Sequence, residues 1–217
     1  MTPVSPTLEL EREILSETST IVALDEVGRG ALAGPVAVGA ALMDARTAAL
    51  EVPEGLRDSK LVTEKRRPDV AARASAWVAS SAVGWASAAE VDDVGIMRAL
   101  GLAASRAILA VAGELAAEAL VLLDGNHDYV SAVHPSPLRV RSVIKGDRDC
   151  ASISAASVIA KVARDEHMGE LHEQFPMYEW VRNKGYASSN HREAIRTLGL
   201  SPFHRASWAI ADAPALF

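Results

Sequence analysis

The order of apolar and polar positions along the chain predicts a mixed α/β protein. Residues 21–24, Ile-Val-Ala-Leu, are apolar at consecutive positions, which is typical of a strand covered on both faces. A turn at Gly34 and Pro35 then leads into a second apolar run over residues 35–43. Further strands are expected over residues 77–88, 119–125 and 138–147.

Helical periodicity marks the remaining stretches. Helices are expected over residues 8–16, 61–76, 95–118 and 150–175. Thr63 is the expected N-cap of the second of these, and Pro68 is expected to kink or restart it. The chain from Pro176 onward is less regular, with one short helix near residues 190–199. Strands that come first in a meander and then alternate with helices indicate an α/β domain with a mixed sheet.

Composition limits the class of protein. The 217 residues fit one domain of generous size, or one domain with a small appendage. Hydrophobic residues make up 49% but aromatics only 5%, so the core must consist mainly of Ala, Val, Leu and Ile. The single cysteine, Cys150, excludes an internal disulfide, favours a reducing compartment and is expected to be a small buried side chain.

No apolar run approaches the length of a membrane span, and the acidic N-terminus lacks a signal-peptide pattern. We therefore expect a cytoplasmic protein with no membrane partner. The sequence leaves the oligomeric state open, with a monomer as the default expectation. The formal net charge of −6 argues at first against nucleic acid, but residues 1–138 hold 11 basic against 19 acidic residues and residues 139–217 hold 11 against 9. Metal could neutralise several carboxylates, so net charge does not decide the partner.

Four carboxylates stand where functional groups usually stand. Asp25 and Glu26 end one apolar strand, Asp124 ends another, and Asp165 lies on a long helix among small residues. The set offers oxygen donors only, so the implied ions are Mg²⁺ or Mn²⁺. Two such ions could clamp the attacking and leaving oxygens of a phosphoryl displacement.

Each carboxylate also has an ordinary structural interpretation. Asp165 could pair with Lys161 on a helix surface, and Asp124 could begin a turn with Gly125. On a regular strand Glu26 would point to the face opposite Asp25, and only a bend, which Gly28 makes possible, would let both reach one site. The combination of the four favours function.

The helix over residues 150–168 adds a second indication. Ser154, Ser157, Lys161 and Asp165 fall along one stripe, with small residues elsewhere that allow close packing on a sheet. We expect this approach to bring Asp165 to the strand ends.

Several ordered motifs resemble those of the ribonuclease HII family. They are DEVGRGALAGPV (25–36), RDSK (57–60), LLDG (122–125), KGD (145–147), AASVIAKVARD (155–165), KGY (184–186) and HR (204–205). The resemblance runs from about residue 20 to 208. It implies a ribonuclease H-like fold, with a five-stranded mixed β-sheet flanked by helices: a catalytic domain over residues 1–175 and a C-terminal helical extension over residues 176–217 packed on the catalytic cleft.

The resemblance also implies an activity and roles for named residues. It implies an endonuclease that cuts the RNA strand of RNA/DNA hybrids and nicks duplex DNA 5′ to an embedded ribonucleotide. Asp25, Glu26, Asp124 and Asp165 would be the catalytic, metal-binding carboxylates. The substrate-binding residues would be Gly28, Arg29 and Gly30, which sense the ribose 2′-hydroxyl and phosphate, Tyr186, which packs on the next sugar, and Lys60 and Lys145.

The chain departs from the family pattern in places. Val27 and Leu61 stand where the family often has Ala and Lys, and the segment NHDYVSAVHPSP after Asp124 resembles an insertion that affects loop geometry and not the metal set. His191 and His204 are expected to be packing or surface residues and not metal ligands. Two other functions remain open: a DNA-cutting nuclease of the same fold, which has no 2′-hydroxyl to sense, and a binding module, which would have lost carboxylates.

Overall fold

A single five-stranded sheet forms the centre of the molecule in the computed structural model, which describes residues 5–113 and 118–208. Its strands are β1 (Thr20–Val27), β2 (Val36–Asp44), β3 (Ser80–Ala86), β4 (Leu120–Asp124) and β5 (Arg139–Val143). Their order across the sheet is β3-β2-β1-β4-β5. β2 pairs antiparallel with both β1 and β3, whereas β1, β4 and β5 run parallel. The predicted mixed sheet is therefore confirmed.

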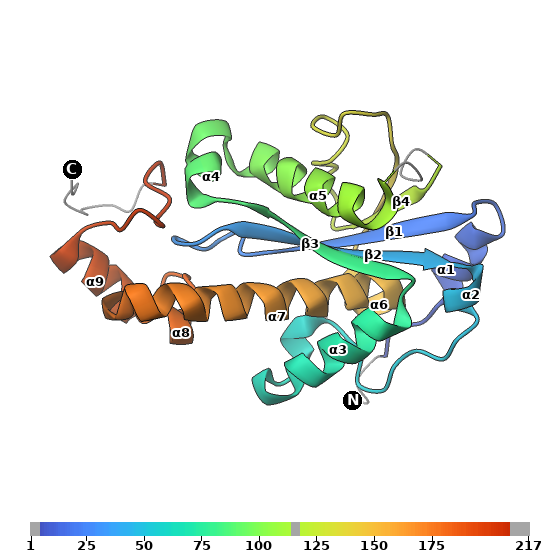
Figure 1. Cartoon of the computed structure of the whole chain (residues 1–217), viewed down its shortest axis with the longest axis horizontal. Helices are drawn as coiled ribbons and strands as arrows, with labels where there is room; N and C mark the ends of the chain where they lie inside the picture. The colour runs from blue at the N-terminus through green and yellow to red at the C-terminus, as the bar shows by residue number, and fades with distance from the viewer. Residues whose placement is uncertain (1–4, 114–117, 209–217) are drawn as a thin grey trace.

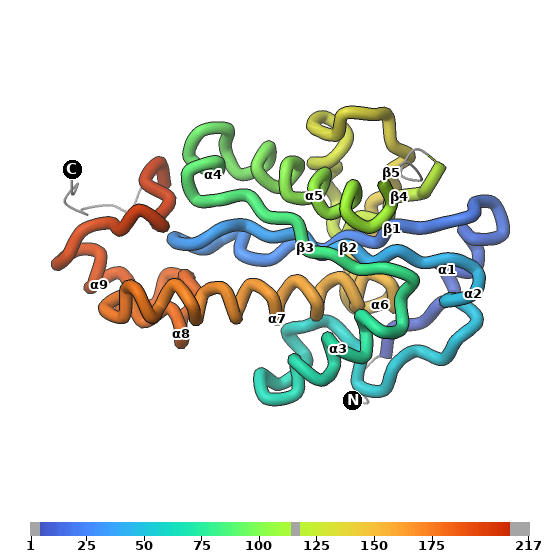
Figure 2. The backbone as a smooth tube through the Cα atoms, in the orientation of Figure 1, coloured from blue at the N-terminus to red at the C-terminus, as the bar shows by residue number. Residues whose placement is uncertain are grey.

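Helices cover both faces of this sheet (Figure 1). They are α1 (Glu9–Leu15), α2 (Ala45–Ala48), α3 (Arg67–Trp77), α4 (Ala88–Val94), α5 (Ile96–Ala112), α6 (Gly146–Asp149), α7 (Ala151–Gln174), α8 (Trp180–Asn183) and α9 (Ser189–Leu198). Short 3₁₀ turns are η1 (Ser59–Leu61), η2 (Glu64–Arg66) and η4 (Pro176–Tyr178). The backbone trace in Figure 2 shows α3 and α7 on one side of the sheet and α4 and α5 on the other.

Several expected elements have different bounds. The helix expected over residues 61–76 begins only at Arg67, with Pro68 in its first turn, where the missing N–H has no helical partner to lose. Thr63 precedes η2 but makes no side-chain cap. The strand expected over residues 77–88 ends at Ala86, because α4 begins with a capping box between Ser87 and Glu90.

Two further bounds differ toward the middle of the chain. The helix expected over residues 95–118 is α5, which ends at Ala112, and residues 114–117 of the prediction lie outside the described residues. The strand expected over residues 138–147 ends at Val143, and α6 follows after a left-handed Lys145.

Small residues let the helices lie close to the sheet. Ile21 and Ala23 of β1 pack into the core on the α7 side, whereas Val22 and Leu24 pack into the core on the α5 side. A Cβ at Gly39 of β2 would overlap the carbonyl oxygen of Ala156 on α7. The Ala-rich composition therefore serves thin helix-to-sheet layers and not a core of large aromatics.

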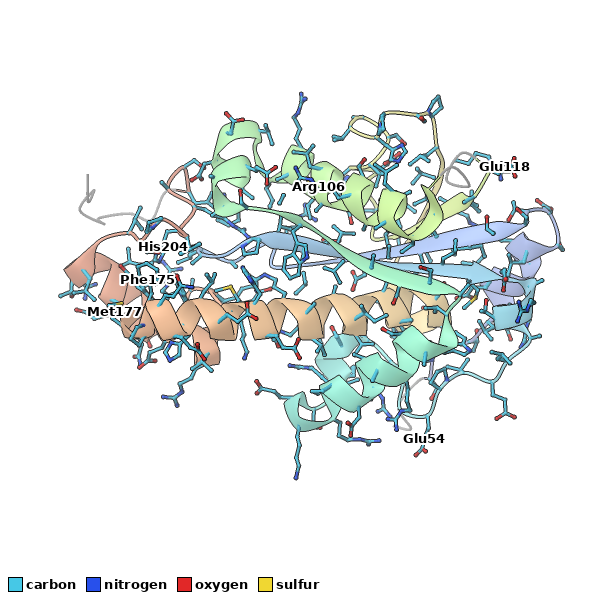
Figure 3. All side chains as sticks on the ribbon, in the orientation of Figure 1. Glu54, Arg106, Glu118, Phe175, Met177 and His204 are labelled. Atoms are coloured by element: carbon cyan, nitrogen blue, oxygen red, sulfur yellow. The ribbon has the colours of Figure 1, made fainter. Side chains whose placement is uncertain are left out.

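The described chain after residue 175 packs against the C-terminal end of α7. Met168 and Leu171 of α7 share a third apolar cluster with Tyr178, Trp180 and Ile195. Figure 3 labels Phe175 and His204 at this end of the molecule. The described part of the extension therefore packs on α7, while the domain boundary at residue 175 stays a prediction and residues 209–217 lie outside the described residues.

His191 and His204 are packing residues, buried side by side in the extension. His191 Nδ1 lies 2.8 Å from the Tyr186 carbonyl and must donate to it, so its Nε2 is an acceptor, 3.1 Å from Trp180 Nε1 and 3.1 Å from His204 Nε2. His204 Nδ1 accepts from the Ser201 N–H at 2.9 Å. Both rings are thus neutral, and burial lowers both pKa values, that of His204 to about 4.

Within the described residues, no helix combines the length and the apolarity needed to cross a membrane.

Candidate active site

The carboxyl ends of the parallel strands bring acidic side chains together. β1 and β4 pair through Leu24 and Leu123, so Asp25 and Asp124 are the next residues on two adjacent strands and share the face covered by α7. Asp147, on the short helix that follows β5, donates its backbone N–H to Asp124 Oδ1 at 3.0 Å. In α/β sheets this edge is where ligands usually bind.

Burial and mutual repulsion raise the pKa values of Asp25 and Asp124. The pKa of Asp25 is raised well above its usual value by burial, then lowered in part by a hydrogen bond with Ser157 and raised again by the charges of Asp124, Glu26 and Asp147. Burial also raises the pKa of Asp124, against the opposing hydrogen bond from Asp147. A cation bound here would remove the repulsion that both shifts report.

Glu26 reaches the group from the other face of the sheet, without the expected bend. The β1–β2 ladder continues regularly through Glu26 and Val27, so the strand does not turn before Gly28. The Glu26 carboxylate lies 3.4 Å from the Tyr129 hydroxyl and 3.4 Å from Arg29 Nη1, on the α5 side. The negative charge of Glu26 nevertheless contributes to the raised pKa values of Asp25 and Asp124, after the larger effect of burial.

Tyr129 is a site residue that sequence reasoning missed. It lies in the insertion-like segment after Asp124, which was expected to affect only loop geometry. Its hydroxyl is buried against Glu26, and burial followed by the Glu26 and Asp25 charges raises its pKa well above the usual value. A phenol held so close to the carboxylates stays protonated and donates to Glu26.

Asp147 is the second missed residue. It is only 8% exposed, and its Oδ2 accepts from Lys60 Nζ at 3.1 Å. Asp147 belongs to the KGD motif (145–147), in which only Lys145 was expected to have a functional role. Lys145 adopts a left-handed backbone (φ 61°) and is exposed, outside this group. Lys60 joins the group as expected, and Asp147 and Asp58 raise its pKa against the opposing effect of burial.

Asp165 requires a correction to the expected grouping. Ser157 of α7 contacts Asp25, and Asp165 lies eight residues farther along that helix, about 12 Å along its axis. Its carboxylate instead accepts from Lys161 at 2.6 Å and lies 3.6 Å from Arg67. The helix does approach the sheet, but it brings Ser154 and Ser157 to the strand ends, with Ser154 donating to the Asp147 carbonyl at 2.7 Å.

Lys161 and Arg67 carry positive charge toward the carboxylates. Both side chains line a cavity of about 480 Å³ together with Asp25 and Glu26. Their side chains are only 16% and 18% exposed, and burial lowers the pKa of Lys161 in spite of the attraction of Asp165. These two cations lie between the carboxylate group and Asp165, and Asp165 orients both.

The Gly28-Arg29-Gly30 loop and Tyr186 line the same cavity. Gly28 has a φ of +83°, and a Cβ there would overlap the guanidinium of Arg164. Arg29 and Gly30 are exposed, and Tyr186 is 38% exposed with Arg164 5.6 Å from its ring centre. The structure therefore brings Asp25, Glu26, Asp124, Lys60, the loop and Tyr186 together, and leaves Asp165 and Lys145 outside this group.

The donor set suits a hard divalent cation. Asp25, Glu26, Asp124 and Asp147 offer carboxylate oxygens, the ligands that Mg²⁺ and Mn²⁺ prefer. Over residues 5–113 and 118–208, no three acidic, His or Cys side chains converge tightly enough to hold an ion as they stand. A shared cation would offset the repulsion between these carboxylates, and small side-chain rotations toward it would complete the site.

Comparisons with known proteins agree with this geometry. A family model for Ribonuclease HII matches residues 22–211. The Ribonuclease HII of Streptomyces avermitilis is 47% identical over 210 residues, covering 96% of this chain and 85% of the relative. That of Streptomyces coelicolor is 46% identical over 211 residues, with the same coverage of both chains.

Solved structures show the same fold. The ribonuclease H2 of Pyrococcus horikoshii OT3 superimposes with a TM-score of 0.64 at 21% identity, covering 88% of this chain and 94% of that one. Bst-RNase HIII in complex with Mn²⁺ gives a TM-score of 0.68 at 20% identity, with coverage of 90% and 70%. From the family model and the sequence relatives together, the chain belongs to the ribonuclease HII family and is a ribonuclease H-type hydrolase.

Proposed function

We propose that this protein is a metal-dependent endoribonuclease that acts, as a monomer, on the RNA strand of RNA/DNA hybrids and on duplex DNA 5′ to an embedded ribonucleotide. One observation carries the proposal. A single cavity is lined by the carboxylates Asp25 and Glu26 at the end of β1, whose neighbour β4 ends in Asp124, and by a glycine-arginine-glycine loop and a tyrosine. Cutting chemistry and sugar recognition would thus act on the same nucleotide.

Asp25, Glu26, Asp124 and Asp147 are the proposed ligands, with Mg²⁺ or Mn²⁺ as the ion. The Mn²⁺ complex of Bst-RNase HIII, a protein of the same fold, supports this choice of metal. Two bound ions would supply an activated water and neutralise charge on the attacking and leaving oxygens. Asp165 was expected among the ligands, but its contacts favour a different role: it holds Lys161 and Arg67 where they can attract the substrate phosphate.

Recognition of ribose is proposed for the Gly28-Arg29-Gly30 loop. Backbone N–H groups next to glycine can approach a 2′-hydroxyl more closely than a side chain can. Arg29, held near Glu26, offers a fork of donors to phosphate. Tyr186 presents a partly exposed ring for the following sugar, where a 2′-hydroxyl would clash. Lys60 and Lys145 are proposed as weaker substrate contacts through phosphate.

The products distinguish this mechanism from other ribonuclease mechanisms. Attack by water leaves a 3′-hydroxyl and a 5′-phosphate, whereas attack by the substrate's own 2′-hydroxyl leaves a 2′,3′-cyclic phosphate. End-group analysis of the nicked strand should find only the first pair. A cyclic phosphate among the products would contradict the proposal.

One assay tests the function as a whole. A DNA duplex with a single ribonucleotide and its all-DNA twin are offered with Mg²⁺, with Mn²⁺ and with EDTA. We expect metal-dependent nicking of the first duplex only, on the 5′ side of the ribonucleotide. Nicking of both duplexes would indicate a general DNA nuclease of this fold, and binding without nicking would indicate a binding module.

A further inference from the structure

Two arginines are fully buried behind the loop of residues 28–35. Arg164 of α7 and Arg205 of the C-terminal extension are both 0% exposed, and neither forms a salt bridge within the described residues. Every side-chain hydrogen bond that the two arginines make in this part of the chain goes to a backbone carbonyl. Arg164 donates to the carbonyls of Ala33, Pro35 and Lys184, and Arg205 to those of Gly28, Arg29 and Gly34.

The contacts of Arg205 determine which way the loop's amide groups point. Its Nη2 lies 2.7 Å from the Gly28 oxygen and its Nη1 lies 2.9 Å from the Arg29 oxygen. In a trans peptide unit the C=O and the following N–H point in opposite directions. Fixing these two carbonyls inward therefore turns the N–H groups of Arg29 and Gly30 away from Arg205.

Within residues 5–113 and 118–208, those two N–H groups have no acceptor. In the described part of the chain, the Arg29 and Gly30 amides donate to no backbone or side-chain acceptor, whereas Ala31 donates to Gly28 and Leu32 to Gly185. Both residues are exposed and line the cavity that holds Asp25. An adjacent pair of free amides backed by a buried cation is suited to an electronegative ligand atom, such as a sugar hydroxyl or a phosphate oxygen.

We infer that Arg205 is a positioning residue for substrate selection: it holds the Gly28 and Arg29 carbonyls so that two amides face the nucleotide. The inference rests on the proposed function, and it assigns to the C-terminal extension a part in reading the sugar. Burial and the nearby Arg164 charge lower the pKa of Arg205 to about 10, so it stays charged at neutral pH. Arg205 touches no substrate itself.

The test compares Arg205→Lys with a matched control in the full-length protein. Lysine keeps the charge, but one ammonium cannot span three carbonyls as the planar guanidinium does. The control is Asp92→Ala, which removes the acceptor for the Ala206 and Ser207 amides. It loosens the same stretch of chain without touching the loop carbonyls.

The readout is the ratio of two dissociation constants, measured by fluorescence anisotropy in an Asp124→Asn background that suppresses cleavage. The ratio divides the Kd for the all-DNA twin by the Kd for the duplex with a single ribonucleotide. A ratio above one is therefore a preference for the ribonucleotide. We expect Arg205→Lys to reduce this preference at least tenfold, and Asp92→Ala to change it less than twofold. Mn²⁺ affinity, measured by calorimetry without the background mutation, should stay within twofold of wild type, because the carboxylates are untouched.

Two results would overturn the inference: an unchanged preference in Arg205→Lys, or an equal loss in Asp92→Ala. If wild type itself shows no preference and no nicking, the proposed function fails instead. Should Arg205→Lys not fold, hydrogen exchange on wild type gives the answer. The Arg29 and Gly30 amides must gain more protection from the ribonucleotide duplex than from its twin, and equal protection would reject the inference.

Discussion

Two pairs of like charges lie close to the same loop: the arginine pair, Arg164 and Arg205, and the carboxylates of Asp25 and Asp124. The protein compensates the repulsion within the first pair but not within the second. Arg164 and Arg205 are buried together, but six backbone carbonyls accept their donors, so the pair is complete within the protein. Asp25 and Asp124 have few donors, and burial and mutual charge raise their pKa values. The arginine pair is therefore a structural anchor, whereas the carboxylates form a site that a cation would complete.

Removing one carboxylate from the group of Asp25 and Asp124 is the most severe test of the proposed metal site. Asp124→Asn keeps the shape of the side chain but removes a charge that the proposed ions need. We expect the turnover rate on a ribonucleotide-containing duplex to fall about 10³-fold, equivalent to about 4 kcal/mol of transition-state stabilisation. Single-turnover cleavage gives the rate, and fluorescence anisotropy should still detect substrate binding.

Asp128→Asn is the matched control for this experiment. Asp128 lies four residues farther along the same segment, and its carboxylate accepts from Val130 and Ser131. An amide oxygen can keep accepting there, so turnover should stay near the wild-type value. Near-normal turnover in Asp124→Asn would mean that the carboxylate group is not the catalytic site.

Membership of the carboxylate group is tested by comparing Asp147 with Asp165. Asp147→Asn should lower turnover about 10²-fold and weaken Mn²⁺ binding, because Asp147 adjoins Asp124. Asp165→Asn should lower turnover less than about tenfold and leave Mn²⁺ affinity unchanged, since Asp165 acts on Lys161 and Arg67. Calorimetric Mn²⁺ titration separates the two, and the reverse ranking would restore Asp165 as a ligand.

The sequence predicted the parallel strand ends well, for a physical reason. Residues 21–24 and 119–123 are apolar at consecutive positions because both faces of β1 and β4 are covered, so the acidic residues that follow stand out. Asp147 follows β5, which lies at the edge of the sheet with several exposed positions, and an irregular turn through Lys145 separates the two. No periodicity marks a residue in that setting.

Helical periodicity misled the placement of Asp165. The stripe of Ser154, Ser157, Lys161 and Asp165 correctly identified the face of α7 that turns toward the site. Periodicity gives the direction of a side chain around the axis but not where along the axis the sheet ends. Likewise, the roles of Tyr129 and Arg205 depend on contacts across about 100 and 177 positions of the chain, which no local pattern contains.

The dependence of stability on metal and on pH distinguishes the carboxylate group from the arginine pair. The folded-state pKa values of Asp25 and Asp124 are raised, so in EDTA their contribution to stability is complete below the ordinary carboxyl pKa and is lost as pH rises through the raised values. Mn²⁺ binds the deprotonated groups, so its stabilisation should grow over the same range. At 100 times Kd we expect about 2.7 kcal/mol, or about 5–10 °C in Tm, at pH 8 and less at pH 5.

Differential scanning fluorimetry in EDTA and in Mn²⁺ measures this increment. Asp124→Asn should lose most of it, and Asp165→Asn should retain it. An increment that is equal at pH 5 and pH 8, or that survives in Asp124→Asn, would place the ion elsewhere. Arg205 should add no pH dependence over this range, because its pKa is about 10.

Substitutions of two glycines in one loop test whether the arginine pair is a rigid anchor. Gly28 has a φ of +83°, and a Cβ there would overlap the Arg164 guanidinium, whereas a Cβ at Gly30 meets nothing within 4 Å. Gly28→Ala therefore combines left-handed strain of about 1–2 kcal/mol with displacement of an arginine that bonds three carbonyls. We expect a loss of about 2 kcal/mol in the free energy of unfolding by urea, against less than about 0.5 kcal/mol for Gly30→Ala. A loss in Gly28→Ala no larger than the left-handed strain alone, about 1 kcal/mol, would mean that Arg164 yields freely, and the anchor would then be as adjustable as the carboxylate group.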